Sequence, residues 1–516
     1  MTAVMLSRVI GYVREAYIAW AFGVGPQTDA YVAAFTLPDW LNYIVAGGTA
    51  SITFISIYTR AMAQKRETEA QKTFSVIITV MSTVLVIGIA LAEIFAPQLV
   101  QLVAPHFDSA QLALCAYLTR ILLPAQLFFY VGGVISAVLL SHRMFLMPAL
   151  APLLYNVFII LGGVLLSGRM GIASLAVGAV SGGIVGPFLV NAIGAARTGI
   201  RYRPSFDVGD PAFREWVRLS IPLMLGVSLA TADDWILRFF GSGSVGAITR
   251  LNYAKRLMAV PIAVLGQATG QATLPFFSRL WGERRLTEFS ETVNGSVYRL
   301  SAASFFASGW MMAISLPLID LVYRRGRFHF DDSRETAILF FWFALSLALW
   351  AAQALYARAF YAAGNTLTPM ISATLITVAS LPVYWTLFHS LGATGLALAS
   401  DVGITANTVA LAVLLHSRRM VPLSGLDWGE LAKAAVVGAV AGLTGYKVAG
   451  FIPLQGSRLA DLESLALGSL TWAAAVGAGL WISRSRLPQE LRRRQPPAVP
   501  LNSEKPAAEL GAGVEP

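Results

Sequence analysis

The sequence predicts an all-α, polytopic integral membrane protein with about 14 transmembrane helices: two six-helix halves in a pseudo-two-fold arrangement, plus two C-terminal helices. Three observations predict this fold class. Only 13% of the 516 residues are charged and 56% are hydrophobic, whereas soluble proteins carry about 25% charged residues. Apolar stretches of about 20 residues, the length that crosses a bilayer, follow one another along the chain. The third observation is an internal repeat, in which segments of the first half recur in the second.

The spans are the apolar stretches between charge clusters, prolines and glycines. Their expected starts lie near Thr2, Asp29, Phe74, Gln111, Phe145, Ile172, Phe213, Val245, Val297, Thr336, Leu367, Ala393, Leu431 and Leu465. The first span carries charges inside it and lacks a basic region followed by a small-residue cleavage site, so we expect it to stay in the membrane. It also begins close to Met1, which leaves the true start codon open.

Clusters of basic residues predict the topology. They follow spans two, six, eight, twelve and fourteen, and comprise Arg60, Lys65, Arg66, Lys72, Arg197, Arg201, Arg203, Arg279, Arg284, Arg285, Arg418, Arg419, Arg484, Arg486, Arg492, Arg493 and Arg494. Because basic residues gather in cytoplasmic loops, we expect both termini in the cytoplasm. The net charge of +10 then reflects topology, and no binding of nucleic acid is expected. The mixed-charge segment "RRGRFHFDDSRE" at 324–335 disagrees and is expected to be an outside loop.

The internal repeat decides the architecture. Three pairs of segments match in order and at nearly one offset: "GIASLAVGAVSGGI" at 171 with "GATGLALASDVGIT" at 392, an offset of 221; Pro148 with Pro369; and "AWAFGVG" at 19 with "LRFFGSG" at 237. Two parallel halves of this kind are a transporter architecture with the substrate site between the halves.

The repeat and the composition together predict four regions. They are an N-terminal six-helix half at 1–200, a second half at 201–420, two additional transmembrane helices at 421–487, and a disordered cytoplasmic tail, rich in Pro, Ala and charge, at 488–516.

The sequence argues against an enzyme. His106, His142, His329, His389 and His416 are scattered without metal-ligand spacing, and the single cysteine, Cys115, lies in an apolar run. The sequence has no P-loop and no nucleophile elbow. The acidic segment "FHFDD" at 328–332 is the only candidate for glycosyltransferase chemistry. We therefore expect no enzymatic activity, no metal and no cofactor.

The first span carries charges in "SRVIGYVRE", which begins at Ser7. An arginine at the centre of a membrane helix costs about 2.5–3.5 kcal/mol, so Arg8 and Arg14 need water, partners or an anionic ligand. Ser7, Gly11 and Arg14 share one helix face, and Arg8 and Glu15 share a neighbouring face on which they can pair. Alternatively, both arginines extend to the cytoplasmic interface and only set the topology.

Spans seven and eight offer charged counterparts in the second half. In "RLNYAKRLMAVP", Lys255 and Arg256 would face the first-half cations and make a positive cavity, or else lie at the outer interface. In "ATADDWILRF", Asp233 and Asp234 could couple to a proton or cation, but we favour pairing of Asp234 with Arg238 at i+4.

Span two combines Asp29 and Asp39 with Pro38, Gly47 and Gly48. Proline and glycine pairs in a membrane helix mark a break or hinge. Such a break fits both an interrupted transporter helix and a simple packing kink.

At this point the motifs resemble the MurJ/MviN family of lipid II flippases, in the MOP superfamily that also contains the MATE exporters. The resemblance covers about residues 6–420 in the family's order. It is carried by "LSRVIGYVREAYIAWAFGVGPQTDAYVAAFTLP", "LVAPHFDSAQLALCAYLTRILLPAQLFF", "PALAPLLYN", "LNYAKRLMAVPIAVLGQATGQATLPFFSR", "YRRGRFHFDD" and "ALYARAFYAAGNTLTP".

The resemblance implies export of lipid II, the undecaprenyl-diphosphate-linked disaccharide-pentapeptide, across the bacterial plasma (inner) membrane for peptidoglycan synthesis. It also implies contact with cell-wall synthesis proteins. In such proteins, arginines of spans one, two and eight line a central cavity and hold the diphosphate. By motif, Arg8 and Arg14 take the span-one places, Asp29 takes the acidic place in "TDA", and Arg256 takes the span-eight place.

Two departures from the family bear on the substrate. The family's span two carries an arginine pair and then Ala-Glu-Gly, where this chain has Asn42, Tyr43 and "AGG". An acidic residue commonly precedes the span-eight arginine, where this chain has Lys255. In one interpretation a cation has moved from span two to span eight. We therefore include Asn42, Tyr43 and Lys255 in the expected substrate site.

The leading hypothesis is a lipid II flippase that works by alternating access. A paralogue that flips another lipid-linked oligosaccharide, or that has lost the activity, is the alternative raised by span two. A MATE-like exporter of organic cations predicts a cavity dominated by carboxylates and aromatic residues. A membrane scaffold predicts partner binding without lipid movement. The coupling ion and the oligomeric state stay open.

Overall fold

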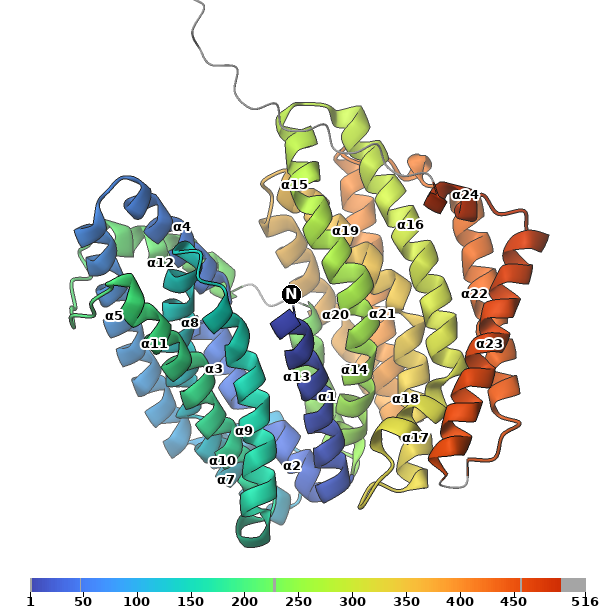
Figure 1. Cartoon of the computed structure of the whole chain (residues 1–516), viewed down its shortest axis with the longest axis horizontal. Helices are drawn as coiled ribbons and strands as arrows, with labels where there is room; N and C mark the ends of the chain where they lie inside the picture. Colours follow the sequence, from blue (N-terminus) through green and yellow to red (C-terminus); the bar gives the residue numbers. More distant parts are fainter. Residues whose placement is uncertain (1, 47, 226–228, 455–456, 493–516) are drawn as a thin grey trace, which may run out of the picture.

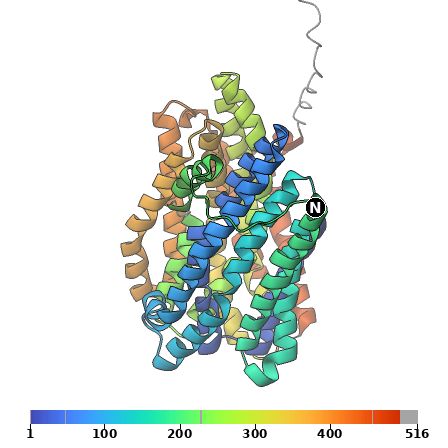
Figure 2. The same ribbon diagram turned by 90° about the vertical axis from the view of Figure 1, so that its left-hand side faces the viewer.

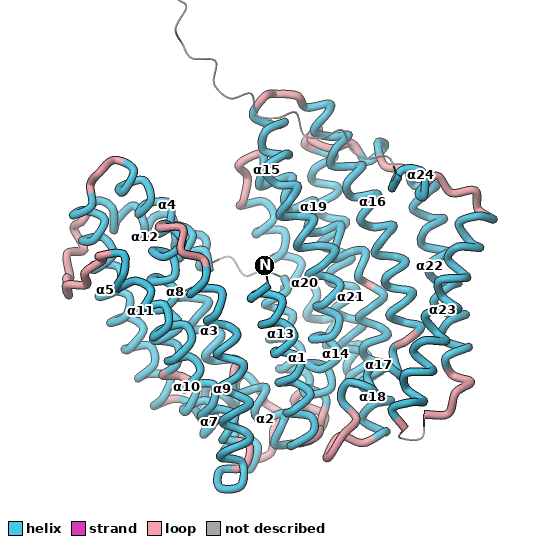
Figure 3. The backbone as a smooth tube through the Cα atoms, in the orientation of Figure 1, coloured by secondary structure: helices cyan, strands magenta, loops and turns pink. Residues whose placement is uncertain are grey.

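The computed structural model describes residues 2–46, 48–225, 229–454 and 457–492, and all regular structure within them is helical (Figure 3). The helices of the first 200 residues are α1 (Thr2–Phe22), α2 (Pro26–Ala34), α3 (Thr36–Ala46), α4 (Gly48–Ala63), α5 (Glu67–Ile94), α6 (Ala96–Val103), α7 (Ser109–Leu122), α8 (Ala125–Ser141), α9 (Leu146–Met170), α10 (Ala173–Gly183), the π-helix η1 (Ile184–Val190), α11 (Asn191–Ala195) and the 3-10 helix η2 (Ala196–Thr198). The fold class predicted from the sequence is confirmed.

The remaining helices lie between residues 211 and 492. They are α12 (Pro211–Leu225), α13 (Leu229–Gly241), α14 (Ala247–Pro261), the π-helix η3 (Ile262–Gln267), α15 (Ala268–Gly282), α16 (Leu286–Ala313), α17 (Ser315–Tyr323), α18 (Phe330–Leu345), α19 (Leu347–Ala362), α20 (Leu367–Leu391), α21 (Ala393–Ser417), the 3-10 helix η4 (Leu423–Gly425), α22 (Trp428–Ala449), α23 (Arg458–Ile482) and α24 (Leu487–Arg492).

The apolar helices and the charged helices fall into separate groups. Within the described residues, 8 helices are long and apolar enough to cross a membrane, or up to 10 if the bent pairs α16/α17 (65°) and α18/α19 (42°) each count as one span. The other long stretches, α1, α2–α4, α12–α13 and α14–α15, contain the charged residues that the sequence singled out. A charged side chain in a membrane helix costs free energy, so its presence marks a functional position.

Two lobes make up the molecule (Figure 1). The first lobe, α2–α12, and the second lobe, α13–α23, lie on opposite sides of α1, which packs on α9 and also contacts α17. Figure 2 shows the first lobe from its outer side. The predicted second half begins at residue 201, but α12 packs on α3, α4 and α5, and α13 packs on α20 and α21. Span seven is therefore shared between the lobes.

The repeat recurs in the helix geometry. Both α9 and α20 have 25 residues, and Pro148 and Pro369 are the third residue of each. A glycine with positive φ follows each helix: Gly171 at 55° and Gly392 at 59°. Residues with a side chain rarely adopt positive φ, so glycine specifies the same local turn after both helices.

Basic residues end several helices at one end of the molecule. Lys65, Arg143, Arg284, Arg419 and Arg484 follow α4, α8, α15, α21 and α23 and adopt positive φ. A cation at a helix C-terminus interacts favourably with the helix dipole. In Figure 1 the α4–α5 connection, the α15–α16 connection and α24 lie toward the upper end, called the basic end below.

The helical breaks in span two differ from the prediction in position. Helix α2 ends at Ala34 and α3 begins at Thr36, so Pro38 lies in the first turn of α3. Proline is tolerated there because the first-turn N–H groups have no partner within the helix. Gly47 lies outside the described residues.

The predicted disordered tail at 488–516 begins with a helical turn, because α24 covers Leu487–Arg492. Leu487 is buried against the α15–α16 region. Glu430 of α22 accepts hydrogen bonds from Ser485 Oγ (2.6 Å) and Arg486 N (3.1 Å). These contacts hold residues 485–487, directly before the predicted tail, and residues 488–492 continue α24. Residues 493–516 lie outside the described residues.

Candidate functional site

Three adjoining pockets, with volumes of about 380, 250 and 320 Å³, lie along α14, two of them beside α1 and two beside α13, and Arg256 lines all three. They are called the central cavity below. The charged residues that line it are Arg8, Arg14, Glu15, Asp39, Asp234, Arg238, Lys255 and Arg256. The structure thus brings together charges from four helices that are distant in the sequence.

On α1, the face formed by Ser7, Gly11 and Arg14 packs against Asn156 of α9. Asn156 accepts a hydrogen bond from Arg14 Nη1 (2.8 Å) and donates one to the carbonyl of Ser7 (3.4 Å). Gly11 lies beside this amide, and a Cβ there would lie at an ordinary van der Waals distance, 3.6 Å, from Asn156 Nδ2. The guanidinium of Arg14 is therefore oriented by a neutral residue of the first lobe.

Glu15 is shared by two arginines. Its carboxylate pairs directly with Arg14, and Arg256 Nε of α14 lies 3.7 Å from the same oxygen. The side chains of Glu15 and Arg14 are 6% and 15% exposed, whereas that of Arg256 is 54% exposed. We call Arg14, Glu15, Asn156 and Arg256 the Glu15 cluster. One carboxylate facing two guanidinium groups leaves an excess of positive charge at the cavity.

Arg8 does not form the ion pair expected with Glu15. Its side chain is exposed and lines the 320 Å³ pocket beside Arg14 and Arg256. Among the described residues, Arg14 of α1 and Arg256 of α14 are the cations that face Glu15.

Lys255 belongs to a different cluster from its neighbour Arg256. Its ammonium lies 2.5 Å from Asp233 Oδ2 and pairs directly with Asp234. Asp233 is buried, and it also accepts hydrogen bonds from Tyr384 Oη and from Ser400 Oγ (2.9 Å). We call these five residues the Asp233 cluster. Here two carboxylates face one ammonium group, so the excess charge is negative.

Arg238 lines the central cavity, but its partners differ from the one that the sequence predicted. The expected pair with Asp234 is replaced: Asp234 pairs with Lys255, and Arg238 Nη1 donates to Asp39 Oδ2 (3.1 Å) and Thr36 Oγ1 (3.0 Å) of α3. The i, i+4 spacing does place Asp234 and Arg238 on one cavity-facing side of α13. That spacing was the available signal, but the partners come from other helices and are set by packing.

Asn42 and Tyr43, which stand in place of the family's arginines, lie on α3 in the first lobe. Asn42 donates from Nδ2 to Gln126 Oε1 (2.9 Å) at the edge of the central cavity. The ring of Tyr43 lies edge-on to Trp235 of α13, with 5.9 Å between centroids. Asn42 lines a pocket together with Asp39, whereas Tyr43 lines neither this pocket nor the central cavity, and neither residue supplies a cation.

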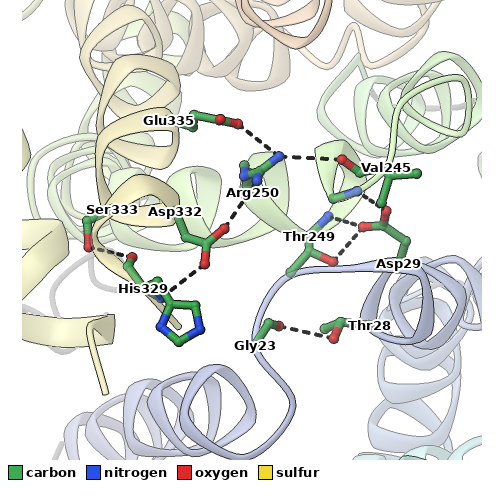
Figure 4. A network of polar contacts seen from close by, with 11 residues as sticks. Gly23, Thr28, Asp29, Val245, Thr249, Arg250, His329, Asp332, Ser333 and Glu335 are labelled. Atoms are coloured by element: carbon green, nitrogen blue, oxygen red, sulfur yellow. Dashed lines mark hydrogen bonds and ion pairs between the residues drawn. The ribbon is translucent and has the colours of Figure 1, made fainter. Parts of the chain in front are cut away.

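Asp29 lies apart from the central cavity and joins the lobes (Figure 4). It is buried, and its carboxylate accepts hydrogen bonds from Gly246 N (2.5 Å), Thr249 N (2.8 Å) and Thr249 Oγ1 (2.6 Å). These donors form the N-terminus of α14, where a negative charge is favoured. Gly246 has φ 80°, and a Cβ there would lie 2.6 Å from Val24. We call Asp29, Gly246 and Thr249 the Asp29 joint.

The segment containing "FHFDD" supports this joint. Arg250 of α14 pairs with Asp332 (3.1 Å) and Glu335 (2.9 Å) of α18, and Asp332 also accepts from His329 N (3.0 Å) at the start of α18 (Figure 4). Asp332 thus caps a helix and holds α14. These contacts give the segment a structural role at the Asp29 joint.

Further contacts hold the lobes together at the same end. His106, between α6 and α7, lies 3.3 Å from Ser242 Oγ after α13. Arg327 N donates to the carbonyl of Trp20 (3.0 Å) near the end of α1. This end lies opposite the basic end in Figure 1.

Comparison with known proteins gives consistent matches. The profile of the family described as "Lipid II flippase MurJ" matches residues 18–459. A probable lipid II flippase MurJ of Rickettsia prowazekii is 27% identical over 369 residues, covering 71% of this chain and 72% of that protein.

Solved structures share the fold. A structure titled "Lipid II flippase MurJ, inward closed conformation" has a TM-score of 0.77 at 21% identity and covers 93% of this chain and 98% of that one. An inward-facing multidrug resistance MATE family transporter of the MOP superfamily has a TM-score of 0.62 at 16% identity, covering 80% and 94%. The fold is therefore that of the MOP transporters.

Proposed function

The chain belongs to the family of the lipid II flippase MurJ and is a multi-pass membrane transporter, and from this premise we propose how it carries lipid II from the inner to the outer leaflet. The central cavity binds the diphosphate, the lipid tail stays in the bilayer, and the two lobes alternate in exposing the cavity to each side. Such transport forms and breaks no covalent bond, so the proposal assigns no catalytic residue.

The observation that carries the proposal is the sharing of Glu15 by two arginines. Arg14 and Arg256 have more positive charge than their single carboxylate neutralises, and Arg256 is half exposed to the cavity. Guanidinium groups suit phosphate oxygens because they present parallel N–H donors and remain charged in a partly dry cavity. Arg8 lines the adjoining pocket and adds a further cation.

Lys255 and Arg238 contribute less to the diphosphate site, because each already has a carboxylate partner at 2.5 and 3.1 Å, respectively. Lys255, the cation expected to have moved from span two to span eight, is therefore already paired with Asp233 and Asp234. The excess of guanidinium charge at Arg14 and Arg256 also argues against a site built for organic cations.

We place the basic end of the molecule in the cytoplasm, with both chain termini on that side. The support is the clustering of basic residues at that end, which is where cytoplasmic loops carry them. In this orientation the Asp29 joint closes the outer side. Moving an anionic headgroup outward is favoured by an inside-negative potential, worth about 2.3 kcal/mol per charge per 100 mV. Contact with cell-wall synthesis proteins stays a prediction.

Complementation tests the proposal. The resident flippase of a bacterial host is depleted, this chain is expressed, and lipid II accessible at the outer face is measured. We expect rescue by the wild-type chain and its loss with Arg14→Ala or Arg256→Ala. Arg169→Ala, at an exposed position in the last turn of α9, is the control expected to rescue. Intact flipping in both cavity variants would show that the diphosphate site is wrongly assigned.

A second candidate is the flipping of another diphosphate-linked saccharide. The observation that favours it is Asn42 in place of a family arginine, because its amide contacts Gln126 and leaves this wall of the cavity without a lysine or arginine. Failure to rescue despite normal membrane expression, together with binding of undecaprenyl diphosphate, would favour this candidate over lipid II.

A further inference from the structure

A side pocket of about 210 Å³ adjoins the central cavity inside the first lobe. It shares Phe35, Asp39 and Tyr155 with the 250 Å³ pocket that contains Arg14 and Arg256. Its wall comes from α3, α7, α8, α9, α10 and the α2–α3 junction, and comprises Phe35, Asp39, Asn42, Leu122, Ala125, Gln126, Phe129, Tyr155 and Ala179. A group bonded to a phosphate in the central cavity can therefore enter this pocket directly.

Two amides, Asn42 and Gln126, line the side pocket beside the carboxylate of Asp39 and the ring of Tyr155. Asn42 Nδ2 donates to Gln126 Oε1 (2.9 Å), which commits one donor and one acceptor of the pair. An amide side chain has both a carbonyl acceptor and two N–H donors, so Asn42 Oδ1 and Gln126 Nε2 can still bind a ligand. The described residues of the wall include no lysine or arginine, and the carboxylate of Asp39 is already paired with Arg238.

Three aromatic residues, Phe35, Phe129 and Tyr155, complete the side pocket. Phe129 and Tyr155 pack edge to face, with 5.3 Å between centroids and 77° between planes. Gly183 at the C-terminus of α10 packs closely on Phe129, because a Cβ there would lie 3.1 Å from its ring. The pocket therefore combines rigid apolar ring surfaces with neutral groups that both donate and accept hydrogen bonds.

We propose that the side pocket binds the N-acetylated sugar that is bonded directly to the diphosphate, and that Asn42 and Gln126 recognise its hydroxyl and acetamido groups. This subsite rests on the proposed function, since the diphosphate must lie beside Arg14 and Arg256. A pyranose offers apolar C–H faces to aromatic rings and hydroxyl groups that are both donors and acceptors, which matches amides. A phosphate would need cations, and this wall supplies none.

Size and position favour the first sugar over the rest of the headgroup. A volume of about 210 Å³ is below the roughly 300–1,000 Å³ of pockets for drug-sized ligands, so it admits one ring and excludes a pentapeptide. The first sugar is bonded to the diphosphate, so it is the part of the headgroup that lies nearest to this pocket. The residue that departs from the family pattern, Asn42, is thus the one that specifies a sugar at this position.

The test compares two lipids on the purified full-length chain in lipid nanodiscs. One probe is undecaprenyl diphosphate, and the other is the same lipid bearing a single N-acetylglucosamine on the diphosphate. We expect the wild type to bind the sugar-bearing lipid about tenfold more tightly, the difference made by one or two hydrogen bonds. Gln126→Leu should remove this preference and leave binding of undecaprenyl diphosphate unchanged. Gln101→Leu, the same change at an exposed position on α6, should retain the preference.

The outcomes separate the subsite from the proposed function. Equal binding of both lipids by the wild type, or a preference that survives in Gln126→Leu, overturns the subsite and leaves the diphosphate site intact. Equal weakening of both lipids by Gln126→Leu assigns Gln126 a structural role and also overturns it. If the wild type binds neither lipid, the proposed diphosphate site fails first and the subsite falls with it. Asn42→Leu, at a half-buried position on the other side of the amide pair, repeats the test if Gln126→Leu does not fold.

Discussion

Lys255 and Arg256 are neighbours on α14, yet they belong to clusters of opposite excess charge. Arg256 shares Glu15 with Arg14 and is 54% exposed, whereas Lys255 is 21% exposed and faces both Asp233 and Asp234. Successive residues on a helix point about 100° apart, so one helix can serve two sites. The Glu15 cluster keeps positive charge available at the cavity, while the Asp233 cluster uses its cation to keep acidic residues inside the second lobe.

A cation in the membrane is not by itself a ligand-binding cation. The sequence shows two adjacent cations, and only their partners distinguish them. Removing Lys255 should mainly change stability, and removing Arg256 should mainly change binding of the substrate.

The largest expected effect is on stability, in Lys255→Met. It leaves Asp233, which is 2% exposed, without its cation. Breaking one side of a buried pair costs about 3–5 kcal/mol, so we expect the free energy of unfolding to fall by about that amount. Chemical unfolding of the purified chain in detergent measures it, with the exposed Lys447→Met as control. If Lys255→Met lowered the free energy of unfolding no more than Lys447→Met does, the Asp233 cluster would not stabilise the fold.

The next effect concerns a carboxylate that is held by backbone N–H groups and a hydroxyl group, Asp29. Asp29→Asn replaces one oxygen of the Asp29 joint with an NH2 group, which cannot accept from Gly246 N or from Thr249. Hydrogen bonds to a charged group contribute about 1.5–3 kcal/mol, so we expect a loss of that size. Thermal unfolding checks it, with the exposed Asp331→Asn as the matched change. Equal melting temperatures for the two variants would show that the Asp29 joint does not contribute to the stability of the protein.

A smaller effect divides the Asp233 cluster itself. Double-mutant cycles pair Lys255→Met with Asp233→Asn and, separately, with Asp234→Asn. We expect a coupling of about 1–3 kcal/mol with Asp233. We expect less than about 1 kcal/mol with Asp234, whose side chain is 50% exposed. A larger coupling energy with Asp234 than with Asp233 would make the exposed Asp234 the main partner of Lys255.

The smallest effect on stability is expected for Arg256→Met. Its contact with Glu15 is 3.7 Å long and the side chain is half exposed, so the pair contributes less than about 1 kcal/mol. Glu15 keeps its direct contact with Arg14. The same unfolding measurement as for Lys255→Met provides the comparison, and a loss above about 3 kcal/mol would make Arg256 a structural residue as well.

The order of helices was predictable because apolar runs mark membrane spans. The starts of α1, α20 and α21 coincide with the predicted starts at Thr2, Leu367 and Ala393. Helix α16, however, begins at Leu286 instead of near Val297, because its first turns are charged and give no apolar signal. Hydropathy therefore locates the membrane-crossing part of a helix and misses its polar extension.

The composition of the site was predictable, but its pairings were not. The face shared by Ser7, Gly11 and Arg14 follows from helical periodicity, and it contacts Asn156 as one surface. The partners of Arg238, Lys255 and Asp29 lie on other helices, at separations of up to 220 residues. Such contacts depend on how the lobes pack, which local spacing does not encode.

The most direct test of the central claim is the dissociation constant of undecaprenyl diphosphate for Arg256→Met, measured beside the wild type in nanodiscs. Loss of a charge-assisted contact to phosphate should weaken binding about 10- to 100-fold while the fold is retained. An unchanged dissociation constant in a folded variant would contradict the claim that the excess charge of the Glu15 cluster holds the diphosphate.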